Sequence, residues 1–200
     1  ELGGLMGLEN YTWTNAHLWF DHWLKGDSNG IMNKAPVSME VKFENERDEF
    51  SDWPLPNLSE DRLYFHERGM LSEGGLKSYP YSPWWSKTDT FYSGIDTIAT
   101  TGIPLLSYFL EAEINTAVTT SIPLISDLNA IVYQTGFLSD DVQLRGIPKI
   151  HLEFKPSKSK GLIMTYLYDV NALGIGKLIT HAPYTFRDVT PGKSTSLDME

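Results

Sequence analysis

The chain of 200 residues contains no cysteine. This absence excludes disulfide bonds, thiolate metal ligands and a cysteine nucleophile, and it favours a cytoplasmic compartment while leaving secretion open. No apolar run approaches the roughly 20 residues that a membrane-spanning helix needs. No stretch resembles a signal peptide, although a removed one would leave no trace.

Lysine and arginine are scarce, 16 against 26 aspartates and glutamates, so the net charge is −10. Nucleic acid and membranes are therefore not expected partners, because anionic surfaces attract clustered cations.

The residues that are present describe a globular protein. Hydrophobic residues make up 41% and charged residues 21% of the chain, which is enough apolar material for a packed core. Aromatic residues reach 12%, a share that suits sheet faces and interfaces better than helical bundles. Composition alone therefore favours a mainly β fold.

One segment has the periodicity of an amphipathic helix. Its apolar side chains form a single stripe made of Ala16, Trp19, Phe20, Trp23 and Leu24. We expect Thr14 or Asn15 to cap its start, Gly26 to end it in the left-handed conformation, and Asp21 to pair with Lys25. Three aromatic rings on one stripe need a partner surface. Trp19, Phe20 and Trp23 are therefore a candidate interdomain face, which packs either on this chain's own sheet or on another domain.

From residue 36 onward the hydrophobic period changes from 3.6 to 2, which indicates half-buried strands. The alternation is seen over residues 37–43, 63–65, 106–114 and 150–154, and further strands are expected at 130–135, 161–170 and 176–182. Residues 100–114 fit a helix as well as a strand, and 126–132 fit a short helical turn. Pro, Gly, Asn and Ser clusters separate these segments, which favours a sandwich or a barrel.

Residues 26–30, Gly-Asp-Ser-Asn-Gly, match the G-x-S-x-G pattern of a serine hydrolase nucleophile. In such enzymes a strand enters the turn and a helix leaves it, so that the helix N-terminus supports the oxyanion. Here the predicted helix enters and a strand leaves, which would place Ser28 beside helix carbonyls. We interpret Ser28 as a turn residue and assign no catalytic residue.

The remaining polar residues give no metal or cofactor site. His17 and His22 lie on the predicted helix, and His66 and His151 fall on the polar side of predicted strands. His181 lies near a strand end and is a weak candidate only. The pair of acids at 140–141 stands alone in a turn, and no zinc-type histidine spacing occurs. We expect no cofactor.

An aromatic cluster interleaved with proline is the best candidate for a contact surface. It consists of Tyr79, Tyr81, Trp84 and Trp85. Stacking platforms for sugars or peptides have this composition, and so do loops packed beneath a sandwich.

Four segments resemble one enzyme family. They are AHLWFDHWLKGDSNG (16–30), the stretch from APVSMEVKF to MLSEGG (35–75), IVYQTGFLSDDVQLRGIPKIHLEF (131–154) and the stretch from GLIMTYLYDV to DVTPGK (161–193). Together they are similar to the end of the catalytic domain and the C-terminal domain of the X-Pro dipeptidyl-peptidase and cocaine-esterase-like (CocE/NonD) α/β-hydrolases. Residues 86–128 match this pattern poorly.

The resemblance implies a jelly-roll, galactose-binding-like β-sandwich that is non-catalytic and helps to wall the substrate cleft of a serine hydrolase. Residues 1–35 would then be the terminal helix and exit turn of an absent α/β-hydrolase domain, the expected partner. Residues 36–200 would be the sandwich, with room for last strands beyond residue 200. The family's nucleophile, acid and histidine precede the helix, so the 200 residues alone are expected to be inactive.

Two other functions stay open. One is a carbohydrate-binding jelly roll, in which Tyr81, Trp84 and Trp85 stack on a sugar ring. The other is an interaction domain that assembles homo-oligomers. The sequence does not distinguish a peptidase from an esterase as the parent enzyme, nor does it identify the substrate.

Overall fold

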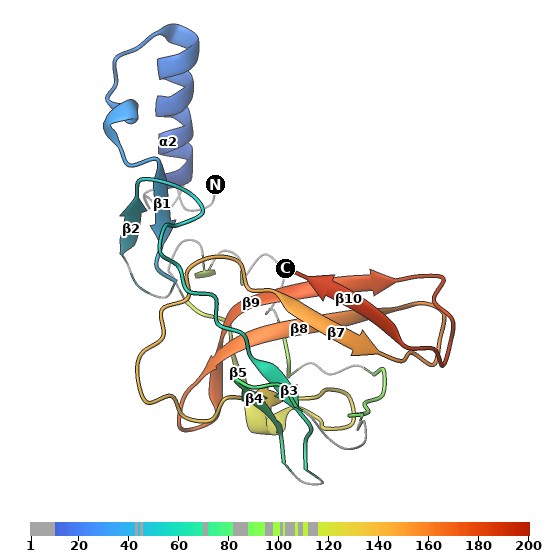
Figure 1. The fold of residues 1–200 in the computed structure, drawn as a ribbon. Coiled ribbons are helices and arrows are strands. Elements are labelled where there is room, and N and C mark those ends of the chain that lie inside the picture. Colours follow the sequence, from blue (N-terminus) through green and yellow to red (C-terminus); the bar gives the residue numbers. More distant parts are fainter. Residues whose placement is uncertain are drawn as a thin grey trace. The chain divides into compact units, whose positions relative to one another are not determined.

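A computed structural model gives the arrangement of most of the chain. It describes residues 11–42, 44, 46–69, 72–81, 88–94, 98–100, 102, 107, 110–111 and 116–200. The fold is mainly β, with one helical segment near the N-terminus and several sheets, consistent with a β-sandwich (Figure 1). The chain forms two compact units. Unit 1 comprises Glu1–Pro56 and Gly102–Val118, and unit 2 comprises Asn57–Thr101 and Thr119–Glu200.

Unit 1 contains the helix and a β-hairpin. Its elements are α2 (Tyr11–Phe20), the π-helical turn η1 (Asp21–Lys25), the 3-10 turn η2 (Ile31–Asn33), β1 (Val37–Glu40) and β2 (Arg47–Phe50). Gly26 ends the helical segment with φ of 80°, and Lys25 pairs with Asp21 at 2.6 Å, so both of these sequence predictions are confirmed. The expected caps at Thr14 and Asn15 are wrong, because the helix already includes Tyr11. The wide π turn is a further difference from the prediction.

Unit 2 holds three sheets. Their strands are β3 (Tyr64–His66), β4 (Gly74–Lys77), β5 (Thr119–Ser121), β6 (Tyr133–Gln134), β7 (Ile150–Phe154), β8 (Gly161–Val170), β9 (Ile175–Phe186) and β10 (Thr195–Met199), and the 3-10 turn η3 (Ile122–Leu124) follows β5. The strand orders are β5-β9-β8, β10-β7 and β3-β4-β6. The long hairpin β8–β9 dominates unit 2, and its pairing begins at Gly161 and Phe186. Only β4 and β6 pair in parallel among the described strands.

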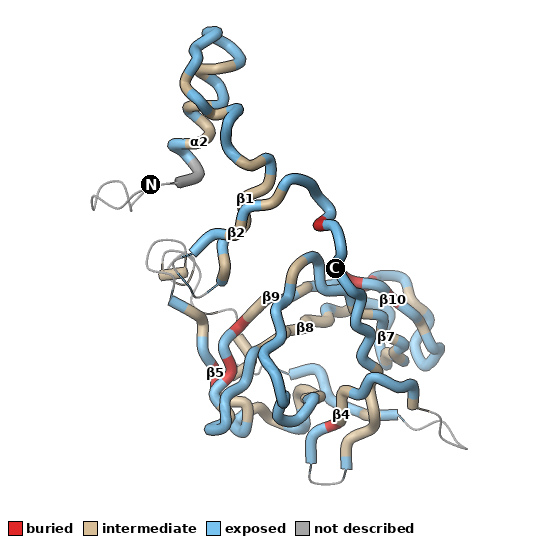
Figure 2. The backbone as a smooth tube through the Cα atoms, turned by 60° about the vertical axis from the view of Figure 1, so that its left-hand side comes forward, coloured by how far each residue is buried: buried red, intermediate tan, exposed pale blue. Residues whose placement is uncertain are grey.

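The core of unit 2 is formed by side chains of β9 and β10, which belong to the antiparallel strand pairs β8–β9 and β7–β10. Leu178, Phe186, Leu197 and Met199 are its buried large side chains, each 9% exposed or less. The rings of Phe154 on β7 and Phe186 on β9 meet at 5.2 Å and so join the two strand pairs. Buried positions are few along the tube in Figure 2, and many large apolar side chains of the described residues stay exposed. A domain with this much exposed apolar surface is typical of one that contacts another surface.

The strands expected at 37–43, 63–65, 130–135, 150–154, 161–170 and 176–182 all contain observed strands. The burial of β7 alternates at every residue, as a half-buried strand requires. In the segment expected at 106–114, the described residues Ser107, Leu110 and Glu111 are helical, so the helical alternative holds there. Residues 127–129 form the expected short turn.

Candidate functional site

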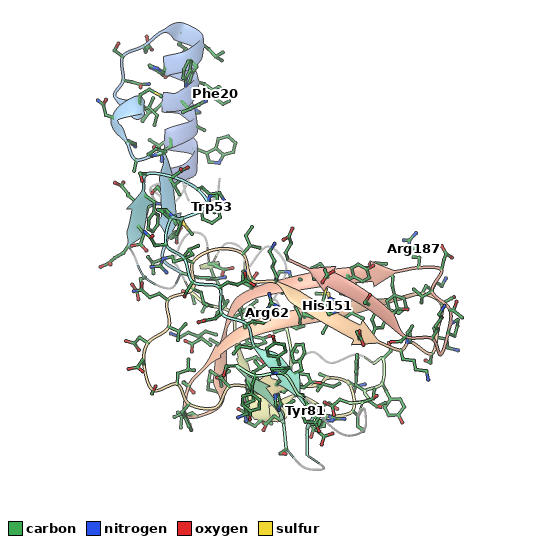
Figure 3. The ribbon with its side chains drawn as sticks, viewed as in Figure 1. Phe20, Trp53, Arg62, Tyr81, His151 and Arg187 are labelled. Atoms are coloured by element: carbon green, nitrogen blue, oxygen red, sulfur yellow. The ribbon has the colours of Figure 1, made fainter. Side chains whose placement is uncertain are left out.

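The helical segment presents an aromatic face to solvent. Trp19, Phe20 and Trp23 are 48%, 56% and 58% exposed, and the rings of Trp19 and Trp23 contact each other at a centroid distance of 5.8 Å. Figure 3 labels Phe20 on this helical segment. The ring of His22 meets Trp23 edge-on. We name Trp19, Phe20 and Trp23 the aromatic face. The three side chains predicted as an interdomain face therefore lie together and accessible.

The opposite side of the helix is covered by the chain that follows it. The side-chain amide of Asn29 donates to the carbonyl oxygen of Leu18 at 2.6 Å, and the Lys34 ammonium donates to the side-chain oxygen of Asn15 at 2.7 Å. Leu18 and Asn15 are only half-exposed. Because the returning segment occupies that side, the aromatic face is the side of the helix that is left for a partner.

Ser28 lies in a turn that connects a helix to a strand, which is the reverse of the strand-to-helix order of a nucleophile elbow. The π turn η1 enters at Gly26, and β1 leaves after η2, so helix precedes strand. Ser28 is exposed. The Nδ1 atom of His22, a histidine of the preceding turn, lies 2.9 Å from the carbonyl oxygen of Asp27. Within the described part of the chain, no imidazole hydrogen-bonds to the Ser28 hydroxyl.

Two of the four residues of the predicted aromatic cluster, Tyr79 and Tyr81, lie in the described part of the chain. The imidazole of His66 contacts the rings of both Tyr79 and Tyr81, with a centroid distance of 5.0 Å in each pair. Its Nε2 atom lies 2.9 Å from the carbonyl oxygen of Tyr79. Tyr79 is 60% exposed, and Tyr81 is labelled in Figure 3. Trp84 and Trp85 lie outside the described residues. His66, which the sequence places on the polar side of a predicted strand, is thus the residue that brings the two tyrosines together.

A polar network lies next to this cluster. The Tyr133 hydroxyl donates to the Asp89 carboxylate at 2.8 Å, and the same carboxylate accepts from the backbone N–H of Arg68. Burial, followed by the bond to Asp89, raises the pKa of Tyr133 well above its ordinary value. The Arg68 guanidinium donates to the carbonyl oxygens of Thr90 and Asp127. These contacts join four segments of unit 2 and are structural rather than catalytic.

The other histidines do not form a reactive site. His151 pairs with Asp198 across β7 and β10 at 2.7 Å, and both side chains are exposed. His181 is exposed on β9, where its ring stacks near that of Tyr166. The described residues contain no group of three or more acidic or histidine side chains placed to bind a metal. None of their helices has the length and apolar character to cross a membrane.

A second exposed apolar surface was not anticipated from the sequence. Residues 135–149, between β6 and β7, have no regular structure and carry five exposed large apolar side chains, Phe137, Leu138, Val142, Leu144 and Ile147. Phe137 is 87% exposed. Loops of this length are often functional. The sequence does show apolar residues inside a turn-rich segment at 135–149. Periodicity analysis does not detect them, because they follow neither a helical nor a strand period.

The comparison with known families identifies the chain. Residues 29–200 match the family described as the X-Pro dipeptidyl-peptidase C-terminal non-catalytic domain. The chain belongs to this family. The C-terminal domain is also 26% identical over 174 residues to a Bacillus anthracis protein that carries the name Xaa-Pro dipeptidyl-peptidase. That match covers 84% of this chain and 24% of the relative, so the chain spans about a quarter of the relative's length.

Family membership confirms the resemblance found in the sequence. The match begins at Asn29, directly after Ser28, so the aromatic face lies outside the matched region.

Proposed function

We propose that this C-terminal domain docks on an α/β-hydrolase domain of the same polypeptide and helps to shape and cover its active-site cleft. The aromatic face carries this proposal. Trp19, Phe20 and Trp23 expose three large rings on a helix whose other side is already occupied. Buried aromatic anchors of this kind dominate the energy of protein interfaces. The missing surface is best supplied by the catalytic domain to which such C-terminal domains belong.

The exposed loop 135–149 supports the same proposal from unit 2. Its apolar side chains cannot be explained by packing within the described part of the chain, since Phe137 and Leu138 are mostly exposed. A long loop with exposed apolar residues is suited to cover the mouth of a cleft and to exclude water from it. We assign this loop the cleft-covering role and the aromatic face the anchoring role.

The parent enzyme is proposed to cleave Xaa-Pro peptides, with acyl-ester hydrolysis as the alternative activity. The name of the Bacillus anthracis relative favours the peptidase. The sandwich is further proposed to have the jelly-roll, galactose-binding-like topology that the sequence motifs resemble. We expect the coding sequence that precedes Glu1 to encode an α/β-hydrolase domain with an elbow serine, an aspartate and a histidine.

Binding of the two separately produced domains tests the docking role. Isothermal titration calorimetry should show association, and Trp19→Ala combined with Trp23→Ala should weaken it by about 2 kcal/mol or more, as expected for central aromatic residues. Tyr92→Ala is the matched control, because Tyr92 is a similarly exposed ring in unit 2 (67%). Equal affinity of the double variant and the wild type would refute the anchoring role.

The cleft-covering role has its own readout. Addition of the C-terminal domain to the isolated catalytic domain should lower KM for Gly-Pro-p-nitroanilide, and a variant with Phe137→Ser and Leu138→Ser should lose this effect while still binding. A KM that does not respond to the added domain would contradict cleft shaping.

A carbohydrate-binding module stays the second candidate, supported by the Tyr79 and Tyr81 rings around His66. Stacking sites for sugars use exposed aromatic rings, and Tyr79 provides one. A glycan array decides between the two. Glycan binding that is lost in Tyr79→Ala would favour the carbohydrate-binding module. If no glycan on the array binds, this candidate function is excluded.

A further inference from the structure

Two loops form one end of unit 2. Residues 155–160 connect β7 to β8, and residues 187–194 connect β9 to β10. Since β8 pairs with β9 and β7 pairs with β10, both loops pass between the same two strand pairs at the same end, as Figure 1 shows in orange and red. Two backbone hydrogen bonds join them, from Val189 N to Ser159 O at 3.1 Å and from Gly192 N to Pro156 O at 2.8 Å. The loops therefore form one continuous surface.

This surface concentrates positive charge in an acidic chain. The loops carry five exposed cations, Lys155, Lys158, Lys160, Arg187 and Lys193, and a single carboxylate, Asp188. The chain as a whole has a net charge of −10. We name these two loops the cationic end.

The five cations of this end have no partner of opposite charge among the described residues. Elsewhere Lys25, Lys42, Arg47, Arg62 and Lys149 each form an ion pair with a carboxylate. Within the described residues, no ion pair or side-chain hydrogen bond reaches any of the five cations of the cationic end. Their charge is thus not neutralised locally, and an acidic partner can pair with it.

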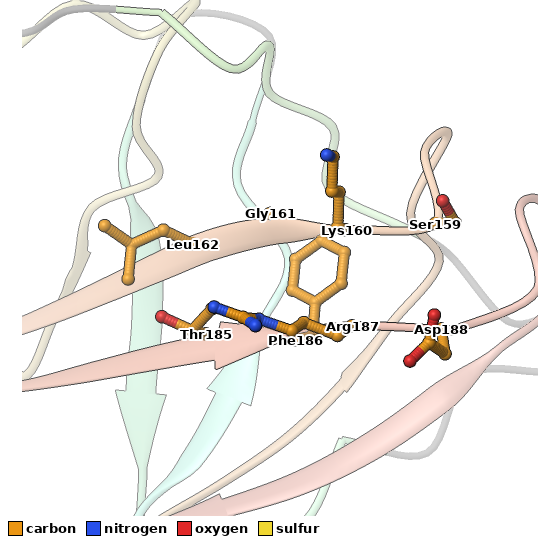
Figure 4. A pocket seen from close by; sticks show the side chains of 8 residues that line it. All are labelled: Ser159, Lys160, Gly161, Leu162, Thr185, Phe186, Arg187 and Asp188. Atoms are coloured by element: carbon orange, nitrogen blue, oxygen red, sulfur yellow. The ribbon is translucent and has the colours of Figure 1, made fainter.

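A surface hollow lies within the cationic end. It has a volume of about 560 Å³ and is lined by Ser159, Lys160, Gly161, Leu162, Thr185, Phe186, Arg187 and Asp188. The ring of Phe186 lies between the two strands, with the Lys160 side chain and the Arg187 guanidinium on different sides of it (Figure 4). The backbone at Gly161 permits this packing, because a Cβ there would lie 2.6 Å from the ring. The hollow thus combines an apolar base with two cationic side chains and two hydroxyls.

We propose that the cationic end binds an acidic peptide segment, with an apolar or aromatic side chain in the hollow and carboxylates paired with Lys160 and Arg187. A short segment fits better than a nucleic acid or an anionic membrane. Charges are screened over roughly 8 Å at physiological salt, so a short peptide meets only the local cations. A long polyanion or a membrane would also face the acidic remainder of the molecule. This inference does not rest on the proposed docking to a hydrolase domain, and its test involves no catalytic domain.

Fluorescence anisotropy with a labelled peptide tests the proposal. Residues 44–52 of this chain, ENERDEFSD, provide a suitable probe with five carboxylates and a phenylalanine. The same peptide with every carboxylate replaced by its amide and the arginine replaced by glutamine is the neutral control. We expect saturable binding of the acidic peptide to the full 200-residue chain, weakened severalfold between low and physiological salt. The neutral peptide should not bind.

Variants assign the binding to the cationic end. Lys160→Gln combined with Arg187→Gln should weaken binding by about twofold to thirtyfold, since exposed ion pairs contribute roughly 0.2–1 kcal/mol each. Lys160→Arg combined with Arg187→Lys keeps the charge and should keep most of the binding. Lys77→Gln is the matched control, because Lys77 is another exposed cation without an ion pair among the described residues, and it should have no effect.

Three results would overturn the inference. The first is equal binding of the acidic and neutral peptides. The second is an unchanged affinity in the Lys160→Gln, Arg187→Gln double variant, provided that its thermal melt matches that of the wild type. The third is tighter binding of a thymidine 15-mer or of phosphatidylserine vesicles than of the acidic peptide. The last result would assign the cationic end to a different class of partner.

Discussion

The side-chain amide of Asn29 holds the carbonyl oxygen of Leu18 at 2.6 Å, across eleven residues of chain. This bond fixes the segment after the helix against one side of α2. The side-chain oxygen of Asn29 also accepts from the backbone N–H of Ile31 at 3.2 Å. A single side chain therefore closes the turn and determines which side of the helix stays open, namely the aromatic face.

Replacement of Asn29 by alanine should loosen this turn. The variant loses two hydrogen bonds of a half-buried side chain, which contribute on the order of 1 kcal/mol each. Hydrogen exchange of the backbone amides in residues 26–34 should then become about tenfold faster, with β8 and β9 unaffected. Ser28→Ala, one residue away and exposed, is the control and should exchange like the wild type. Unchanged exchange in Asn29→Ala would show that the turn does not depend on this side chain.

Gly161→Ala should destabilise unit 2, because the added Cβ would lie 2.6 Å from the Phe186 ring. Overpacking of this kind costs roughly 1–3 kcal/mol. The measurement is the free energy of unfolding in urea. In the background of Phe186→Leu the cost of Gly161→Ala should be smaller, since the two positions are coupled. A cost that is the same in both backgrounds would mean that the ring does not cause it.

Stability should fall at alkaline pH through Tyr133. Burial, and then the bond to Asp89, raises the pKa of this phenol above its ordinary 10.0 in the folded protein. The unfolded chain therefore releases the proton first. The contribution is fully present below the ordinary pKa and is lost as the pH rises toward the folded value.

Urea unfolding at about pH 8 and about pH 11 measures this effect. Tyr133→Phe should be less stable than the wild type at the lower pH by about 1 kcal/mol, because a hydrogen bond is lost. It should also lose less stability on going to the higher pH. Tyr92→Phe, at an exposed position, should follow the wild type at both values. Parallel pH profiles for the wild type and Tyr133→Phe would contradict the assignment.

Local patterns sufficed to predict much of the fold. A sequence shows directly those features that depend on residues within two helical turns of one another. The helical stripe, the left-handed Gly26 and the Asp21–Lys25 pair are of this kind. The alternation of Ile150–Phe154 likewise predicted β7. Strand β2 was missed because its residues, Arg47–Phe50, are mostly charged, and such a strand is stabilised by its pairing with β1 rather than by an apolar pattern.

The contacts that define the candidate sites are long-range and could not be derived from spacing. His66 meets Tyr79 and Tyr81 only after β3 and β4 have paired. The cationic end arises because the pairing of β8 with β9 and of β7 with β10 brings residues 155–160 next to residues 187–194. In the sequence these cations are separated by about a full hairpin, and nothing in either stretch alone indicates the other.

The most direct test of the central claim, that this domain is non-catalytic and that Ser28 is a turn residue, is labelling of the purified 200-residue chain with a fluorophosphonate probe. Such probes react with activated serines, and Ser28 lacks a histidine partner within the described residues. We predict no labelling and no turnover of p-nitrophenyl acetate or Gly-Pro-p-nitroanilide above background. Labelling or turnover that disappears in Ser28→Ala would contradict the account.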